Sequence, residues 1–155
     1  MELYDHQIDA LKRMHNGCIL NGGVGSGKSR TSLAYYFFSI AKGKVSVNGK
    51  GTYAVPENPV PLYIITTARK RDTHEWESEM VPFMLSTNEE ESIKNIKVII
   101  DSWNNVQKYV GITNSFFIFD EQRVVGKGTW AKSFIKIAKA NRWILLSATP
   151  GDTWS

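Results

Sequence analysis

The sequence has a single cysteine, Cys18, so no disulfide bond can form within the chain. A reducing compartment suits such a protein, and we expect the cytoplasm, or the host cytoplasm if the protein is phage-encoded. Long apolar runs are also missing, since no stretch approaches the roughly 18 residues of a membrane-spanning helix. Residues 1–5 lack the basic start and the apolar stretch of a signal peptide. We therefore expect no membrane partner.

Histidine is scarce, and charge of one sign is only slightly in excess. The three histidines, His6, His15 and His74, lie in unrelated segments, which argues against a zinc site. The net charge of +4 permits a polyanionic partner but does not establish one. With 155 residues, of which 42% are hydrophobic, the chain has the size and composition of one globular domain.

Glycine is concentrated in residues 21–29, Asn-Gly-Gly-Val-Gly-Ser-Gly-Lys-Ser, which fit the Walker A pattern G-x-x-x-x-G-K-[ST]. Backbone N–H groups of such a loop surround phosphate oxygens, and glycine permits both the close approach and the positive φ. Lys28 would place its charge on the β- and γ-phosphates, and the Ser29 hydroxyl would bind Mg²⁺. A glycine-rich turn without a ligand is the weaker interpretation, because chance matches to this pattern are rare. The predicted nucleotide contacts are Gly22, Gly23, Val24, Gly25, Ser26, Gly27, Lys28, Ser29 and Arg30.

Short apolar runs alternate with helical patterns along the chain, which predicts an α/β fold with a mostly parallel sheet and helices on both faces. We expect strands at 18–20, 62–66, 96–100, 116–120 and 143–147. We expect helices at 2–15, 29–41, 71–85, 102–109 and 131–140. Residues 42–61 interrupt the alternation with glycines and prolines, and they predict a surface insertion with a hairpin around Val45–Val55.

Polar residues follow the predicted strands, and ligands of such sheets bind beyond the carboxyl ends of the strands. Asp120 and Glu121 come directly after the apolar run 116–119. An aspartate at a strand end can hold Mg²⁺, and the glutamate beside it can orient or deprotonate water, which nucleotide hydrolysis requires. An Asp-Glu pair without a function is common on protein surfaces, but its place after an apolar strand favours the catalytic interpretation.

Gln7 remains open on the residues alone. It could read an adenine edge, because an amide donates and accepts hydrogen bonds at once, or it could be an exposed residue at a helix start. Ser147 and Thr149 end the last predicted strand, and on the residues alone a capped strand end that runs into a proline turn is the better interpretation.

Taken in order, four segments resemble the Q motif and motifs I, II and III of superfamily-two helicases and translocases, the DEAD/DEAH-related group. These segments are Tyr4-x-x-Gln7, the Walker A loop, Asp120-Glu121-Gln122-Arg123 and Ser147-Ala148-Thr149. Residues 64–68 with 76–79, and residues 98–103, resemble the motif Ia and Ib regions of the Swi/Snf-like branch. The resemblance covers nearly the whole chain except 42–61.

The resemblance implies that residues 1–155 form the N-terminal RecA-like lobe, a P-loop NTPase domain that binds ATP and Mg²⁺ and hydrolyses ATP. It implies roles for Tyr4 and Gln7 at adenine, for Lys28 and Glu121 in catalysis, and for Ser29 and Asp120 at the metal. Coupling is implied for Arg123, Ser147 and Thr149. Contacts to DNA or RNA phosphates are implied for Thr67, Arg69, Lys70 and Ser102. The segment 69–71 also fits a basic helix start with no nucleic-acid role.

The chain departs from the family at several points. Arg123 stands where the family usually has His or Asp, Gln122 replaces a small residue, and the motif Ia region lacks a common proline. The sequence ends just after motif III, so the second RecA-like lobe, with its arginine fingers, is an expected partner outside it. Three alternatives are a viral terminase ATPase, a small-molecule kinase, and a binding module that has lost catalysis. No segment looks like the basic lid of a kinase, and intact Lys28 and Asp120 disfavour the third alternative.

Overall fold

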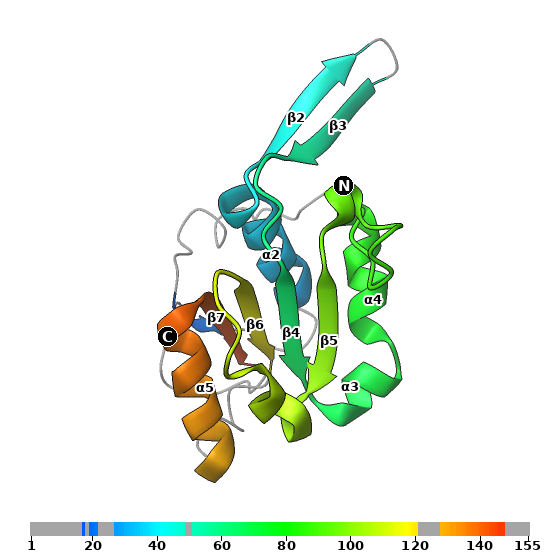
Figure 1. Cartoon of the computed structure of the whole chain (residues 1–155). Helices are drawn as coiled ribbons and strands as arrows, with labels where there is room; N and C mark the ends of the chain where they lie inside the picture. Colours follow the sequence, from blue (N-terminus) through cyan, green and yellow to red (C-terminus); the bar gives the residue numbers. More distant parts are fainter. Residues whose placement is uncertain (1–16, 18, 22–26, 49–50, 121–127, 148–155) are drawn as a thin grey trace.

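The computed structural model describes residues 17, 19–21, 27–48, 51–120 and 128–147 (Figure 1). Its centre is a sheet of β1 (Ile19–Asn21), β4 (Leu62–Thr66), β5 (Val98–Ser102), β6 (Phe116–Asp120) and β7 (Arg142–Ser147). The strand order is β1-β7-β6-β4-β5, and every neighbouring pair is parallel. The predicted parallel α/β architecture is therefore confirmed.

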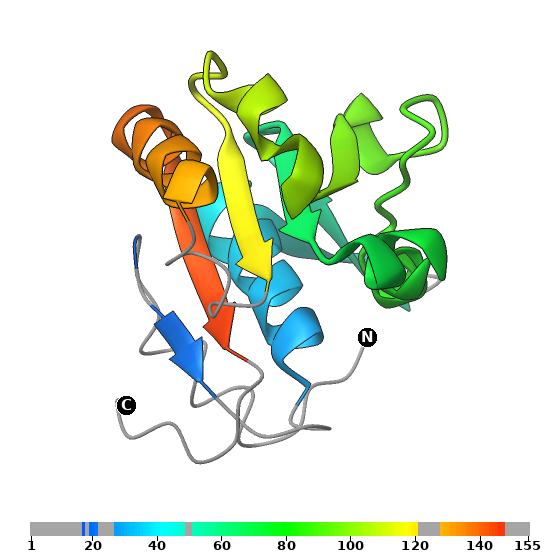
Figure 2. The same ribbon diagram turned by 90° about the horizontal axis from the view of Figure 1, so that it is seen from below.

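Helices cover both faces of the sheet, as Figure 2 shows. Those on one side are α2 (Lys28–Tyr35), continued by a π-helical segment η1 (Tyr36–Ile40), and α4 (Glu75–Met80), continued by the 3₁₀ turn η2 (Val81–Phe83). On the other side lie the 3₁₀-helix η4 (Trp103–Tyr109) and α5 (Gly128–Ala140). Two short elements, α3 (Ala68–Asp72) and the 3₁₀ turn η3 (Ile93–Asn95), flank β5.

The alternation of side chains along β4 and β6 divides the core into two layers. Leu62 and Ile64 pack with α2 and α4, whereas Tyr63 and Ile65 pack with η4 and α5. Both layers are dense in aromatic rings, and the ring of Tyr63 stacks on that of Phe117 with centroids 4.8 Å apart. A strand that is covered on both faces must be apolar at every position, which is why these two strands could be located from the sequence.

The hairpin predicted around Val45–Val55 is present. Strands β2 (Gly43–Asn48) and β3 (Gly51–Pro56) pair antiparallel and form a separate two-stranded sheet. Figure 1 shows the hairpin projecting from the end of the molecule opposite to the arrowheads of β4 and β5. Its base is tied down where the backbone N–H of Asn58 donates to the carbonyl oxygen of Ala41 at 2.8 Å.

The predicted helix at 71–85 was wrong. The segment is divided into α3, α4 and η2, because His74 takes a left-handed conformation with φ 58° between the first two. The predicted helix at 102–109 is a 3₁₀-helix, and the strand predicted at 96–100 lies two residues further along, at Val98–Ser102. The predicted helix at 2–15 lies outside the described residues.

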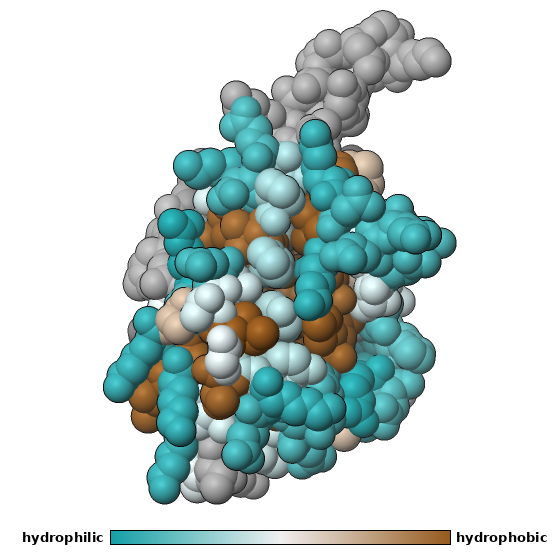
Figure 3. Space-filling view, viewed as in Figure 1, coloured by the Kyte–Doolittle hydropathy of each residue, from teal (hydrophilic) through white to brown (hydrophobic). Residues whose placement is uncertain are grey.

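The outer surface is mainly polar. In Figure 3, hydrophobic areas lie in patches between hydrophilic side chains rather than as one continuous face. Within the described ranges, no helix combines the length and the apolar character needed to cross a bilayer.

Truncation of the central aromatic layer should be costly. Phe117 has no exposed surface, so Phe117→Ala should lower the free energy of unfolding by about 3–5 kcal/mol through lost burial and a cavity. Ile135→Ala is the control, because Ile135 is 50% exposed on α5 and a surface change of this kind alters stability by about 0.5 kcal/mol or less. Urea denaturation measures both. Equal losses would contradict the two-layer core.

Candidate functional site

The carboxyl ends of the strands meet in register at one edge of the sheet. Asp120 pairs with Leu146, which pairs with Leu20, and the next residues along, Asn21 and Ser147, also pair. Strand β7 thus lies between β1, which leads into the Walker A loop, and β6, which ends at Asp120. Two strand spacings amount to roughly 10 Å, so the carboxyl ends of β1 and β6 lie about that far apart at one edge of the sheet.

The start of α2 is described from Gly27 onward. Gly27 caps the helix in a left-handed conformation with φ 75°, in which a residue with a side chain would be strained. Its carbonyl oxygen accepts hydrogen bonds from the N–H and the hydroxyl of Thr31, at 3.0 and 3.1 Å. Lys28 is the first residue of the helix and Ser29 the second, and both are half-buried. Residues 22–26 of the loop lie outside the described part of the chain.

Asp120 is a buried acid at this edge with several hydrogen bonds to one of its oxygens. Its side chain is 4% exposed, and its Oδ2 accepts three hydrogen bonds. The donors are the Thr66 hydroxyl at 2.8 Å, the Lys70 ammonium at 3.1 Å and the Trp76 indole N–H at 3.1 Å. Among the described residues, none donates to Oδ1. One oxygen is therefore held in place, and the other accepts no hydrogen bond from the residues that the structure describes.

The donors come from three different elements. Thr66 ends β4, Lys70 lies on α3 and Trp76 on α4. The backbone carbonyl of Asp120 is held as well, because the indole N–H of Trp103 on η4 donates to it at 2.8 Å. The position of this carboxylate is thus set from both faces of the sheet.

The next acid along the edge, Asp101, has a different environment. It lies in β5 and accepts hydrogen bonds from the Ser102 N–H, the Asn105 amide, the Arg71 guanidinium and the Tyr109 hydroxyl, at 2.7, 2.9, 3.1 and 2.6 Å. Burial acts to raise the pKa of Asp101, but these hydrogen bonds together hold it below its usual value. Burial, and then the bond to Asp101, raises the pKa of Tyr109. Both oxygens of Asp101 are occupied by the chain itself.

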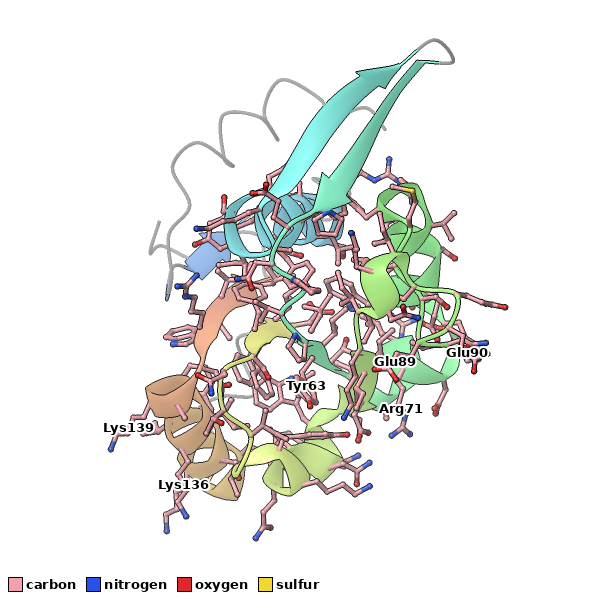
Figure 4. The ribbon with its side chains drawn as sticks, turned by 45° about the horizontal axis from the view of Figure 1, so that its top comes forward. Tyr63, Arg71, Glu89, Glu90, Lys136 and Lys139 are labelled. Atoms are coloured by element: carbon pink, nitrogen blue, oxygen red, sulfur yellow. The ribbon has the colours of Figure 1, made fainter. Side chains whose placement is uncertain are left out.

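Helix α3 connects the two acids. Its consecutive residues Lys70 and Arg71 point to opposite neighbours of β4, with Lys70 bound to Asp120 on β6 and Arg71 to Asp101 on β5. Arg71 also donates to the Ser102 hydroxyl at 3.3 Å and pairs with the exposed Asp72. Figure 4 shows Arg71 beside the carboxyl end of β5.

A cavity of about 330 Å³ joins the start of α2 to the partners of Asp120. Its lining comprises Ser29, Lys70, Thr73, His74, Glu75, Trp76, Ser78 and Glu79. A larger cavity of about 500 Å³ lies at the opposite edge of the sheet, where Asn58 and Ser115 precede β4 and β6 and Arg142 begins β7. The larger one has no carboxylate in its lining and is remote from the Walker A loop, so we assign the chemistry to the smaller one.

The remaining predicted residues divide into two groups. Arg30 forms an ion pair with Glu79 at 3.4 Å, Thr67 caps α3 by accepting from the Lys70 N–H, Arg69 is exposed, and Ser102 is 1% exposed. Ser147 is described only through its backbone pairing with Asn21. The predictions for Tyr4, Gln7, Gly22, Gly23, Val24, Gly25, Ser26, Glu121, Arg123 and Thr149 fall outside the described residues.

No family model and no curated protein matches this sequence. Solved structures do resemble it. The SWI2/SNF2 ATPase core of Sulfolobus solfataricus, solved in complex with double-stranded DNA, matches 97% of this chain with a TM-score of 0.64 and 20% identity. The UvsW helicase of bacteriophage T4 matches 98% with a TM-score of 0.65 and 16% identity. A mutant of the large terminase ATPase domain of Thermus phage P74-26 matches 99% with a TM-score of 0.55 and 15% identity.

The chain has the helicase-type RecA-like fold. It spans 32% of the Sulfolobus chain, 54% of the UvsW chain and 68% of a terminase ATPase chain. Lys28, Ser29 and Asp120 were predicted from motifs in this RecA-like domain, whereas the hydrogen bond of Thr66 to Asp120 was not predicted. Trp76 was noted only as part of a motif Ia resemblance. A polar residue that ends an apolar strand, as Thr66 does, is the one signal that could have drawn attention to it.

Asp101 should make the stability of this RecA-like domain depend on pH. Because its pKa is lowered by folding, its contribution is present above the unfolded pKa of about 3.9 and is lost as the pH falls through the folded value. Asp101→Asn should cost on the order of 2 kcal/mol at pH 7, and the difference from wild type should narrow below about pH 4. Urea denaturation across this range measures it.

Asp72→Asn is the matched control, because the side chain of Asp72 is 66% exposed although it also pairs with Arg71. Its effect should be small and nearly independent of pH. A difference between Asp101→Asn and wild type that persists unchanged in acid would show that the Asp101 carboxylate is not stabilised by its hydrogen bonds.

Proposed function

We propose that the chain is the ATP-binding lobe of a nucleic-acid helicase or translocase. The observation that carries the proposal is the Asp120 carboxylate, two strands from β1. Three donors hold one of its oxygens, and none of the described residues donates to the other. The RecA-like fold supports the proposal, because the solved structures that resemble this chain include a SWI2/SNF2 ATPase core and the UvsW helicase.

The residues present fit Mg²⁺, a hard cation that prefers oxygen ligands and near-octahedral geometry. Ser29 would contribute its hydroxyl, and Asp120 would act through Oδ1, directly or through a water molecule. The ion would neutralise phosphate charge. Lys28 would hold the β- and γ-phosphates, Glu121 would orient and deprotonate the attacking water, and Tyr4 with Gln7 would contact adenine. Each of these roles can be tested by substituting the single residue that would perform it.

Nucleic acid is the proposed partner at the neighbouring surface. Thr67, Arg69, Lys70 and Ser102 would contact phosphates of one strand of DNA or RNA, while Arg123, Ser147 and Thr149 would couple that contact to the nucleotide state. A grip on phosphates is largely independent of sequence, which suits a motor that moves along its track. The second RecA-like lobe would close over ATP and supply arginine fingers.

A terminase ATPase is the second candidate, and one observation favours it. The terminase ATPase domain that resembles this chain is itself only moderately longer, with 68% of its length matched. A nuclease domain following residue 155 in the gene product would favour the terminase, whereas a second RecA-like lobe would favour the helicase.

Removal of the Walker A lysine should abolish most nucleotide affinity. Lys28→Ala deletes a charge-assisted contact to phosphate, so we expect about 10-fold to 100-fold weaker binding of Mg·ATP, corresponding to about 1.5–3 kcal/mol. Titration of a fluorescent ATP analogue measures it. Lys132→Ala is the control, because Lys132 is an exposed lysine of α5. Unchanged affinity in Lys28→Ala would refute a nucleotide site at the Walker A loop.

Turnover by this chain alone should be slow. An arginine finger contributes on the order of 10³ or more in rate, and none is expected within residues 1–155. Steady-state release of phosphate, with and without duplex and single-stranded DNA or RNA, measures it. Adding the second lobe should raise the rate, and Glu121→Gln should abolish that gain. Vigorous turnover by the 155-residue chain alone would contradict a shared site between two lobes.

A further inference from the structure

Lys70 contacts Asp120 in the structure, although its proposed partner is a nucleic-acid phosphate. The proposed function places its ammonium on a nucleic-acid phosphate, whereas the structure places it 3.1 Å from Oδ2 of Asp120. Asp120 is also the proposed ligand of the metal. A lysine and a divalent cation would therefore share one buried carboxylate, and the two positive charges would repel each other across a few ångströms of protein.

We propose that Lys70 is a displaceable counter-ion that links the two sites. It pairs with Asp120 when no nucleotide is bound, and it turns outward to a nucleic-acid phosphate when Mg·ATP occupies the site. This inference rests on the proposed function. It makes Lys70 a positioning residue, because it acts on the reaction through Asp120 and through the nucleic acid.

The surroundings of Lys70 permit such a movement. Its side chain is 23% exposed at the edge of the cavity that Ser29 also lines, whereas that of Asp120 is 4% exposed. A lysine side chain has a long flexible stem, so its ammonium can swing several ångströms without moving the backbone. Lys70 can therefore leave Asp120 toward solvent without unfolding α3.

Asp120 would keep its position after Lys70 leaves. The Thr66 hydroxyl and the Trp76 indole still donate to Oδ2, and both residues are almost fully buried, with 0% and 1% of their surface exposed. The two donors that remain, Thr66 and Trp76, are buried and neutral. The donor that leaves, Lys70, is charged, and the incoming metal ion replaces its charge beside Asp120.

The neighbours of Lys70 on α3 explain why it, and not Arg71, would make the exchange. Arg71 is held by Asp101 and by Asp72, and neither acid is a proposed metal ligand. Arg69 is exposed, and its side chain forms no hydrogen bond or ion pair with another described residue. Release of Lys70 would therefore place a second cation beside Arg69 on the surface that the proposed function gives to nucleic acid.

Exchange of this kind couples the two binding affinities. If bound Mg·ATP raises the affinity for nucleic acid by releasing Lys70, then bound nucleic acid must raise the affinity for Mg·ATP by the same factor. In addition, one more phosphate contact should appear in the salt dependence of nucleic-acid binding. Each contact changes the slope of log K against log salt by about 0.9 for duplex DNA.

The test measures binding of a fluorescent DNA duplex to the 155-residue chain over a range of salt concentrations. Both arms contain the same low Mg²⁺ concentration, and one also contains a non-hydrolysable ATP analogue. In wild type, the analogue should steepen the slope by about 0.9. In Lys70→Met it should leave the slope unchanged. Lys136→Met removes an equal charge from α5, away from α3 in Figure 4, and should behave as wild type.

A second measurement distinguishes release from simple support of Asp120. Lys70→Met removes a competing cation, so the Mg²⁺ concentration for half-maximal binding of the analogue should fall several-fold. If Lys70 only held Asp120 in place, that concentration would rise. Circular dichroism checks that the variant is folded. If it is not folded, the comparison of the wild-type slopes with and without the analogue still tests the exchange.

The outcomes separate the two proposals. Wild type that binds both the analogue and DNA, with one slope in the two arms, overturns the exchange and leaves the proposed function standing. A higher Mg²⁺ requirement for analogue binding in Lys70→Met also overturns the exchange and leaves the proposed function standing. Wild type that binds neither the analogue nor DNA overturns the proposed function itself.

Discussion

The hydrogen bonding of one buried carboxylate organises the functional edge of this molecule. A carboxylate that is 4% exposed is costly to bury unless donors surround it, and Asp120 has three on one oxygen. Because those donors come from β4, α3 and α4, the same residue that could hold a metal also fixes how these elements lie. Loss of Asp120 would leave the Thr66 hydroxyl and the Trp76 N–H buried without an acceptor, so its structural and chemical roles are inseparable.

Asp101 and Asp120 show how similar acids at one edge acquire different roles. Asp101 is surrounded by donors from its own β5–η4 segment and from Arg71, and both of its oxygens accept hydrogen bonds. It stabilises the turn after β5. Asp120 keeps one oxygen without a donor from the described residues and adjoins the cavity that reaches Ser29. The difference is in the number of donors supplied by the chain, not in the residue type.

The sequence predicted the parts of this structure that depend on local patterns. The strands at 62–66 and 116–120 match residue for residue, because apolar runs covered on both faces are easily recognised. The glycine pattern before Lys28 also agreed with the start of α2, where Gly27 is the N-cap with a positive φ. The prediction of one helix at 71–85 was wrong because the residue in the left-handed conformation is His74, not the glycine or asparagine that usually indicates such a turn. The bonds of Asp120 to Thr66 and Trp76 span 54 and 44 residues, and only the folded chain could reveal them.

Under the proposed function, the topology offers two routes by which nucleotide binding would affect other parts of the protein. One is β7, which lies between β1 and β6 and ends at Ser147, so a shift of either neighbour bears on its end. The other is α3, whose consecutive basic residues contact the acids of β6 and β5. A five-residue helix that is held at both sides can hardly move as a body without breaking an ion pair. A change in one side chain is the less costly response, and of the two cations only Lys70 has a partner that a metal could take over.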